Sequence, residues 1–384
     1  MLLDKALMAF ASVSLSLIAK LFLHTNKTEV EMPDEGSIIY CNHTSDLDFI
    51  SLLYALYPRR DVRFVVSDVQ YDKSRLRKWL FKHLGIIRKQ QGTHDLVCVK
   101  EIIKNVRAGK VVVIYAAGMT SYDGRQAWDA LPGSANLGKM LKCPVYVALI
   151  HGGFLNRPRH ASKLYRGRLD ISVKRLFSSE EIALLPIAEA EKRLNDAMRF
   201  NDWDWQEKEK VIFRGLGLTG ANLPLYRCPA CGAEGRMKAD KHGISCPDCG
   251  FSAKTDALGF FVSGDPACPR RMDAWVDAEI SELKKEIGQD GFRLSAPVTL
   301  MRKTEKSKYL PACKGVLTMD KEGVRFDGET PVELAFKEFQ FFVLGDGKFL
   351  QINTSETAFR FAFDDGALVT KWFFAHRLLC GIEA

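Results

Sequence analysis

The chain is organised around one stretch near its start, Cys41-Asn42-His43-Thr44-Ser45-Asp46-Leu47-Asp48-Phe49. A short apolar run at residues 37–40 precedes this stretch and is typical of a buried strand. An apolar segment of helix length, residues 49–56, follows it. The sequence therefore predicts that His43 lies in a strand-to-helix turn and that Asp48 lies in the first turn of the helix.

His43 and Asp48 together have the chemistry of a general base. Polar catalytic groups collect at the strand ends of α/β folds. A histidine titrates near neutral pH and can take a proton from an alcohol, while a nearby carboxylate fixes its tautomer and stabilises the imidazolium ion. The alternative is that His43 caps the helix beside a solvated Asp48, and two residues alone do not separate these interpretations.

The whole string carries more information than the pair. An Asn-His dipeptide, four residues and an aspartate, entered from a buried strand, resemble the first motif of the glycerolipid acyltransferase family, the 1-acylglycerol-3-phosphate acyltransferases and their relatives. The resemblance covers roughly residues 35–215. It implies that His43 is the catalytic base, that Asp48 orients it and that Asn42 contributes to substrate binding. In the family this base deprotonates an acceptor hydroxyl, which attacks an acyl thioester.

A second part of the resemblance follows a basic segment, residues 73–83. Gly85, an apolar pair and then Arg88 and Lys89 resemble the family's second motif, in which a basic residue after an apolar strand binds the acceptor's phosphate. Arginine at a strand end suits bidentate phosphate binding. The resemblance implies that Arg88 and Lys89 bind substrate, with Gln91 as a third residue that can align with the expected arginine.

The third motif of the family is a strand ending in Pro-Glu-Gly, followed by an arginine–serine pair. Gly118 and Ser121 match this motif, which implies that they contribute to substrate binding. Ala116 and Ala117 replace the proline and the glutamate, and Thr120 replaces the arginine. Because the glutamate and the arginine organise the acceptor's polar head in the family, the sequence leaves open an altered acceptor or a catalytically weakened relative.

The rest of the resemblance lies downstream. Arg125 is a candidate for a displaced cation, and the apolar, proline-containing run at residues 143–150 resembles the family's fourth motif. Strands and helices alternate up to this run, a pattern that indicates an α/β fold, and residues 166–173 are expected to form an outer strand. We assign residues 29–222 to an α/β acyltransferase domain.

The N-terminal segment has the pattern of an amphipathic helix. Residues 6–23 are apolar apart from serines and one lysine, slightly short of the ~20 residues that a spanning helix needs. Polar residues recur on one helical face: Lys5, Ser12, Ser16, Lys20, His24 and Lys27. Another face is apolar: Leu3, Leu7, Phe10, Leu17 and Leu21. We expect residues 1–28 to lie in the membrane interface with lysines towards the headgroups; a signal peptide, for which no good cleavage site follows, and a core helix are the alternatives.

The strongest local pattern is a pair of Cys-x-x-Cys knuckles, formed by Cys228, Cys231, Cys246 and Cys249. Four thiolates suit tetrahedral zinc, and because four ligands leave no open position the site is expected to be structural. We assign residues 223–262 to a small zinc ribbon, with four free buried cysteines as the alternative. A subset of the bacterial acyltransferase family carries such a ribbon directly after its catalytic domain.

The pattern changes again in residues 263–384. Residues 274–287 have the charged amphipathic pattern of a helix. Short alternating segments separated by glycine-containing turns then predict a series of strands, and residues 367–379 predict a last helix. Several strands capped by a C-terminal helix resemble a pleckstrin-homology-like (PH-like) barrel, a mainly-β module that often binds lipid headgroups or protein partners.

Composition limits the compartment and the partners. The chain has 384 residues, enough for two or three domains, and its net charge of +8 favours anionic partners such as phosphates, coenzyme A, an anionic membrane surface or nucleic acid. It has ten cysteines and no apparent cleavable signal peptide, so we expect a reducing compartment and no disulfide framework.

Together these observations predict a 1-acylglycerol-3-phosphate acyltransferase-like O-acyltransferase at the cytoplasmic face of the bacterial cytoplasmic membrane. The donor is expected to be acyl-coenzyme A (acyl-CoA) or acyl-carrier protein, and the acceptor a lysophospholipid, with zinc purely structural. The main alternative is a non-catalytic lipid-binding or scaffold protein that kept the dyad but lost the third motif. A nucleic-acid-binding zinc ribbon is a third option, but we expect no nucleic-acid partner because the residues between the knuckles lack the aromatic and basic pattern that stacks bases.

Overall fold

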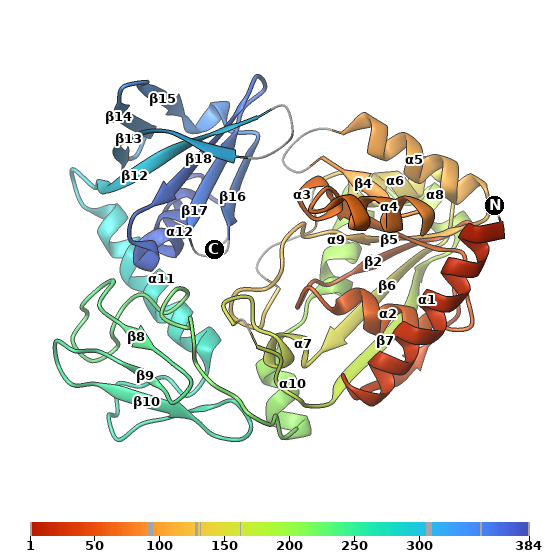
Figure 1. The fold of residues 1–384 in the computed structure, drawn as a ribbon, viewed down its shortest axis with the longest axis horizontal. Helices are drawn as coiled ribbons and strands as arrows, with labels where there is room; N and C mark the ends of the chain where they lie inside the picture. Colours follow the sequence, from red (N-terminus) through yellow and green to blue (C-terminus); the bar gives the residue numbers. More distant parts are fainter. Residues whose placement is uncertain are drawn as a thin grey trace. The chain divides into compact units, whose positions relative to one another are not determined.

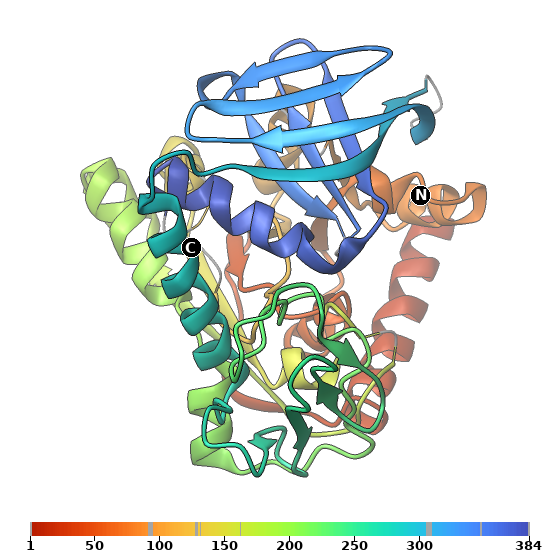
Figure 2. The same cartoon turned by 90° about the vertical axis from the view of Figure 1, so that its left-hand side faces the viewer.

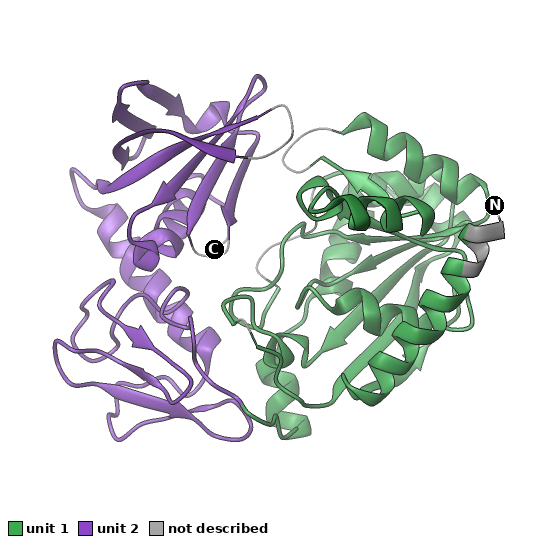
Figure 3. Cartoon of the chain, in the orientation of Figure 1, with its two compact units in different colours: residues 1–91, 95–215 green, residues 92–94, 216–384 purple. Residues whose placement is uncertain are grey.

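The computed structural model describes residues 2–90, 95–126, 130, 132–161, 163–304, 309–345 and 348–382. The chain divides into two compact units, residues 1–91 with 95–215 and residues 92–94 with 216–384 (Figure 3). The ranges predicted for the ribbon and for the C-terminal domain both fall in the second unit. Gln91, the third candidate for the second motif, lies outside the described residues.

The first unit contains a seven-stranded sheet in the order β1-β7-β6-β2-β5-β3-β4 (Figure 1). Its strands are β1 (Thr25–Val30), β2 (Ile38–Cys41), β3 (Val62–Ser67), β4 (Ile87–Lys89), β5 (Val111–Tyr115), β6 (Val145–His151) and β7 (Leu169–Phe177). Every neighbouring pair is parallel except β6 with β7. The predicted α/β class is therefore confirmed, and the loops that follow β2, β5 and β6 leave the sheet at the same edge.

Helices cover both faces of this sheet. They are α1 (Leu2–Leu21), α2 (Asp48–Leu56), α3 (Asp68–Tyr71), α4 (Arg75–His83), α5 (Leu96–Arg107), α6 (Ser134–Leu141), α7 (Gly153–Asn156), α8 (Ser179–Leu184), α9 (Ile187–Met198) and α10 (Asp202–Glu209). Side chains alternate along the buried strands, so Ile38 and Tyr40 pack towards α5, α6, α8 and α9, while Ile39 and Cys41 pack towards α2.

The first helix contacts α2, and its Leu15 and Ala19 pack in one apolar cluster with Ile50 of α2. Ser12 is buried, and the hydroxyl oxygens of Ser12 and Ser16 have no hydrogen-bond partner in the described part of the chain. The predicted polar face of this helix is therefore divided, since Ser12 lies inward whereas Lys20 is exposed, and a contact of the lysines with headgroups stays a prediction. The larger apolar residues Phe10, Leu17 and Leu21 stay exposed. Lys20 and His24 are exposed and Leu7 and Lys27 are half-buried, whereas the side chains of Leu3 and Lys5 lie outside the described residues.

Two predicted boundaries in the first unit need correction. Strand β1 begins at Thr25, so the predicted helical segment, residues 1–28, includes strand residues. The strand predicted at residues 166–173 is not an outer one, because β1 pairs with the edge of β7 that would otherwise be free. In the described residues, no helix combines the length and the apolar composition needed to cross a membrane.

The second unit begins with a four-stranded ribbon sheet in the order β11-β10-β9-β8. Its strands are β8 (Lys238–Ala239), β9 (Ile244–Ser245), β10 (Ser252–Thr255) and β11 (Phe261–Val262). The predicted long helix follows as α11 (Met272–Gly288), and α12 (Val369–Leu379) ends the unit. Between them lie seven antiparallel strands in the order β15-β14-β13-β12-β18-β17-β16 (Figure 2).

The seven strands of this second sheet are β12 (Leu294–Lys303), β13 (Tyr309–Met319), β14 (Gly323–Gly328), β15 (Val332–Ala335), β16 (Phe341–Gly345), β17 (Phe349–Asn353) and β18 (Ala358–Phe363), with short 3-10 helices η1 (Phe336–Glu338) and η2 (Gly366–Leu368). Helix α12 packs on β16 and β17. The mainly-β character and the terminal helix are as predicted. Because β15 and β16 are the two edges, the strand pairing of the described residues does not close a barrel, and PH-like identity stays a prediction.

Ion pairs join the ribbon to both α11 and α12. Arg227 pairs with Glu234 at 2.9 Å and with Glu286 of α11 at 3.0 Å. Lys371 of α12 pairs with the same two carboxylates at 2.6 Å each. Glu279 of α11 is buried beneath them and accepts a hydrogen bond from the Arg227 backbone nitrogen at 2.8 Å. These contacts fix the ribbon, α11 and α12 to one another.

The Glu279→Gln variant is expected to be more stable than the wild type at alkaline pH. Burial raises the pKa of Glu279 well above its ordinary value. In the unfolded chain this carboxyl releases its proton near pH 4, whereas in the folded chain it keeps the proton to higher pH. The folded state therefore loses stability as pH rises above the unfolded pKa, and glutamine removes this loss. The melting temperature of the variant should exceed that of the wild type by an amount that grows from pH 4 to pH 8.

The matched control for this prediction is Glu282→Gln. Glu282 lies on the same helix, but its carboxylate is more exposed and pairs with Lys285 at 2.6 Å. The pair and a nearby arginine hold the pKa of Glu282 below its ordinary value, so this variant should not become relatively more stable as pH rises. If the difference in melting temperature between Glu279→Gln and the wild type stayed constant or shrank as pH rose, Glu279 could not be neutral in the folded chain.

Candidate active site

Asn42 joins the ends of β2 and β6. Its side chain is fully buried, its amide nitrogen donates to Ile150 O at 2.8 Å, and its amide oxygen accepts from Ile150 N at 2.9 Å. Both ends of the amide are therefore used inside the fold. Asn42 thus positions the turn that carries His43 against the neighbouring strand, and its expected role in substrate binding stays a prediction.

The structure brings His43 and Asp48 together. His43 Nδ1 lies 2.8 Å from Asp48 Oδ2; the Asp48 side chain is 2% exposed and the His43 side chain 22% exposed. When Nδ1–H donates to the carboxylate, the neutral imidazole carries its lone pair on Nε2. Within the described residues, Nε2 has no hydrogen-bond partner, so it is available to accept a proton from a bound molecule.

Further contacts hold the dyad from both sides. Asp48 also accepts hydrogen bonds from the backbone nitrogens and the hydroxyls of Thr44 and Ser45, at 2.7–3.1 Å. The ring of Tyr115, at the end of β5, stacks on the imidazole with centroids 4.3 Å apart. Burial raises the pKa of Tyr115 well above its ordinary value, so its phenol stays neutral. A base whose orientation is fixed in this way is pre-organised for proton transfer.

The loop after β5 packs directly on the turn that carries the dyad. Ser121 N donates to His43 O at 2.8 Å. The Ser121 hydroxyl donates to Arg125 O at 2.6 Å and accepts from Gly124 N at 2.9 Å, so this buried serine orders the loop, and its predicted substrate contact stays a prediction. Gly118 is exposed and adopts a φ of 71°, a conformation that favours glycine. A substrate contact at Gly118 stays a prediction.

The substituted positions of the third motif carry no charge. Ala116 and Ala117 are buried and Thr120 is half-buried. The guanidinium of Arg125, the candidate for a displaced cation, contacts Asp123 Oδ2 through Nε at 2.9 Å and through a terminal nitrogen at 2.7 Å. A phosphate that binds this edge of Arg125 has to compete with Asp123.

The structure does not place the two basic residues of the second motif beside the dyad. Arg88 and Lys89 lie in β4, three strands from β2 and about 14 Å across the sheet. Arg88 contacts Asp72 through Nε at 2.8 Å and through a terminal nitrogen at 2.7 Å, and Lys89 Nζ donates to Gln90 O at 2.8 Å. Phosphate binding by Arg88 and Lys89 stays a prediction, and at Arg88 a phosphate that uses the same edge has to compete with Asp72.

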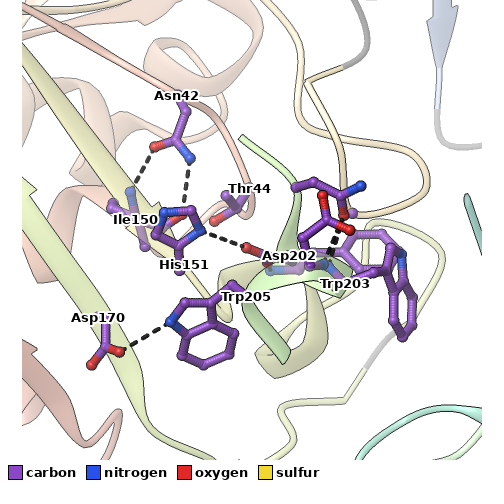
Figure 4. A network of polar contacts seen from close by, with 12 residues as sticks. Asn42, Thr44, Ile150, His151, Asp170, Asp202, Trp203 and Trp205 are labelled. Atoms are coloured by element: carbon purple, nitrogen blue, oxygen red, sulfur yellow. Dashed lines mark hydrogen bonds and ion pairs between the residues drawn. The ribbon is translucent and has the colours of Figure 1, made fainter. Parts of the chain in front are cut away.

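A second histidine–aspartate pair lies at the end of β6 and is absent from the sequence prediction. His151 Nδ1 is 3.5 Å from Asp202 Oδ1, and the imidazole stacks parallel to the Trp205 ring (Figure 4). Asp202 is fully buried, and this burial raises its pKa. Its backbone nitrogen donates to Gly124 O at 2.8 Å. Asp202 therefore holds Gly124 in the loop after β5, the same loop whose Ser121 donates to His43 O.

The sequence did contain a signal for His151. It ends an apolar run that becomes a buried strand, and it precedes two glycines, just as His43 follows the apolar strand β2. The sequence does not reveal that β6 pairs with β2, because this pairing depends on the order of the strands in the sheet. Asp202 lies 51 positions later (202 − 151), at the start of α10, and no local pattern connects it to His151.

The four predicted cysteine ligands come together in the ribbon. Cys228, Cys231, Cys246 and Cys249 place their sulfur atoms within 4.8 Å of one another. The Cys228–Cys249 and Cys231–Cys246 sulfur separations are 3.7 and 3.8 Å. These are too long for disulfides, whereas a tetrahedron with zinc–sulfur bonds of 2.3 Å has edges of about 3.8 Å. The four thiols fit a metal such as zinc.

One family model matches part of the chain. The acyltransferase family model matches residues 23–150, a segment that includes His43, Asp48 and strands β1 to β5. No curated protein matches the sequence. One similar solved structure is that of PlsC, the 1-acyl-sn-glycerophosphate (LPA) acyltransferase from Thermotoga maritima, with 15% sequence identity and a TM-score of 0.41. The match covers 53% of this chain and 81% of the other.

Proposed function

We propose that this chain, whose residues 23–150 match the acyltransferase family model, moves a fatty acyl group from acyl-CoA or acyl-carrier protein to the hydroxyl of a lysophospholipid such as 1-acylglycerol-3-phosphate. The observation that carries the proposal is the 2.8 Å contact between His43 Nδ1 and Asp48 Oδ2 at the end of β2. This contact leaves Nε2 of a fixed imidazole free to act as a base.

The proposed reaction follows from that arrangement. Nε2 of His43 takes the proton of the acceptor hydroxyl while Asp48 stabilises the imidazolium ion that forms. The hydroxyl oxygen attacks the thioester carbonyl, a carbon–oxygen bond forms, and the carbon–sulfur bond breaks. His43 then returns the proton to the leaving thiolate. The products are an acylated lipid and a free thiol, and the base regains its starting state.

A second candidate function rests on the third motif. Ala117 and Thr120 stand where the family motif has glutamate and arginine, so a lipid-binding or scaffold protein with weak or no catalysis is the alternative. Against it, the dyad and the hydrogen bonds that hold Asp48 are complete. A protein that only binds lipid has no evident need for an oriented base.

Activity with a panel of acceptors separates these functions. Labelled acyl-CoA and labelled acyl-carrier protein are each offered to lysophospholipids with different headgroups, and the acylated products are resolved by chromatography. Preference for 1-acylglycerol-3-phosphate supports the proposal as stated. Preference for another lysolipid keeps the reaction and changes the acceptor, whereas binding without turnover on every acceptor supports the scaffold.

The cysteine cluster is proposed to hold one structural zinc ion. Its four sulfur ligands complete a tetrahedral shell and leave no position for substrate. Each knuckle closes through a glycine: Gly232 N donates to Cys228 O and Gly250 N donates to Cys246 O. Both glycines adopt positive φ, as this tight turn requires. The metal would therefore stabilise the ribbon without taking part in acyl transfer.

The outer face of α1 is proposed to rest on an anionic membrane surface. Phe10 is 73% and Leu17 is 52% exposed, and Lys20 follows on the same helix. An apolar face with cations beside it suits the boundary between headgroups and acyl chains. The acceptor and its product are membrane lipids, so this position would bring them within reach of the dyad.

Phe10→Gln combined with Leu17→Gln is expected to weaken binding to vesicles that contain anionic lipid by about tenfold or more, because two apolar side chains no longer leave water. Flotation of full-length protein with vesicles measures the effect. The matched control is Leu184→Gln combined with Ile187→Gln, since both of these apolar residues are also exposed in the first unit. Equal binding by the two double variants would argue against α1 as the membrane contact.

A further inference from the structure

The loop after β6 carries an arginine that is anchored on the catalytic turn. Arg157 follows α7, and its Nε lies 2.7 Å from Asp46 Oδ1. Asp46 is one of the four residues between His43 and Asp48. The cation is therefore held on the same short turn as the proposed base, although it comes from a different strand connection.

Arg157 uses only one position of its guanidinium in this contact. Within the described residues, its two terminal nitrogens have no hydrogen-bond or ion-pair partner, and the side chain is 33% exposed. Arg88 and Arg125 differ, because each places Nε and a terminal nitrogen on one carboxylate. The two terminal nitrogens of Arg157 can therefore bind another anion.

The backbone holds the β6 loop tightly against the turn. Gly153 lies so close to Thr44 that a Cβ at this position would collide with the threonine hydroxyl. Thr44 is itself bonded to Asp48 through both its backbone nitrogen and its hydroxyl. Since β6 is the direct neighbour of β2, Arg157 emerges next to the dyad, whereas Arg88 emerges three strands away.

We propose that Arg157 binds a phosphate group of a substrate, taking over the work that an arginine at the position of Thr120 performs in the third motif of the family. The identity of the phosphate-bearing molecule rests on the proposed function. It is either the headgroup of the acceptor or a phosphate of the acyl carrier. Two terminal guanidinium nitrogens match two phosphate oxygens, and this bidentate geometry distinguishes arginine from lysine.

The test measures equilibrium binding to the full-length chain by titration calorimetry with two probes, a short-chain water-soluble lysophosphatidic acid and coenzyme A. Arg157→Gln is expected to weaken the binding of one probe by about 10- to 100-fold, the usual cost of losing a charged hydrogen-bond partner. A loss confined to lysophosphatidic acid assigns the acceptor phosphate, and a loss confined to coenzyme A assigns the donor. Arg157→Lys should restore only part of the affinity.

Asp46→Asn separates phosphate binding from a purely structural ion pair. If the Arg157–Asp46 contact only stabilised the turn, both variants would lose the same ion pair and weaken binding alike. The proposal requires opposite directions, because the asparagine oxygen can still accept from Arg157 Nε while the negative charge that repels a bound phosphate is removed, so Asp46→Asn should tighten phosphate binding. Arg175→Gln is the matched control: Arg175 also pairs with an aspartate, but it is paired in register with Tyr146, near the opposite end of β6.

Two results would overturn the proposal. One is unchanged affinity for both probes in Arg157→Gln, including the case in which the wild type binds neither. The other is an equal loss in Arg157→Gln and Asp46→Asn. Acyl transfer is measured separately on the same preparations. A wild type that binds a probe through Arg157 but shows no turnover would refute the proposed function and leave the phosphate site intact.

Discussion

His43→Ala is expected to lower the rate of acyl transfer by about 10²- to 10⁴-fold, the range for loss of a general acid–base group. The reason is that Nε2 of His43 is the group placed to take the acceptor's proton, and alanine has no substitute for it. The imidazole also stacks on Tyr115, but it is partly exposed, so the fold should persist. Initial rates at saturating acyl-CoA, with the melting temperature checked in parallel, measure the effect.

Two variants make this prediction sharper. In Asp48→Asn the amide can donate to Nδ1 and select the wrong tautomer, so the rate should fall although the histidine is present. His242→Ala removes an exposed histidine of the ribbon and should leave the rate unchanged. If His43→Ala kept a rate within a few-fold of the wild type, another group would have to be the base, and His151 would become the first candidate.

Cys246→Ser is expected to release the metal and to destabilise the second unit. Structural zinc contributes strongly to the stability of small cysteine-rich folds, and we expect a loss of about 3 kcal/mol or more, which corresponds to a fall in melting temperature of about 10 °C. The loss should extend beyond the ribbon, because Arg227 and Glu234 connect it to α11 and α12. Elemental analysis should give about one zinc per wild-type chain.

The control for this variant is Cys313→Ser. Cys313 is a half-buried cysteine in β13 that is not part of the metal cluster. It should keep the metal and melt within about a degree or two of the wild type, as substitutions away from special features do. Wild-type protein that contains no zinc as purified, together with a Cys246→Ser variant that melts at the wild-type temperature, would show that the four cysteines do not hold a structural zinc ion.

The sequence predicted the features that depend on local chemistry. The Asn-His string after an apolar run led to the strand, the turn and the helix that bring His43 to Asp48, since both residues belong to one short turn. The Cys-x-x-Cys spacing predicted the cluster in the same way. The apolar face of α1 was also found from periodicity alone, although which neighbour would cover the other face was not.

The features that the sequence missed depend on contacts between distant segments. Asn42 positions the turn because Ile150 of the neighbouring strand offers both backbone groups. Ser12 is buried although it belongs to the polar face that periodicity predicts for the first helix. The contact of Arg157 with Asp46 joins residues 111 positions apart (157 − 46), and only the order of β2 and β6 brings them together.

The most direct test of the central claim is acyl transfer by the purified full-length wild type, compared side by side with His43→Ala in the presence of vesicles that contain lysophospholipid. If His43 is the base of acyl transfer, the wild type forms labelled diacyl phospholipid from labelled acyl-CoA or acyl-carrier protein. The His43→Ala variant then forms less than about a hundredth as much product in the same time. Equal product from the two proteins, or no product from the wild type with either donor and any lysophospholipid, would contradict it.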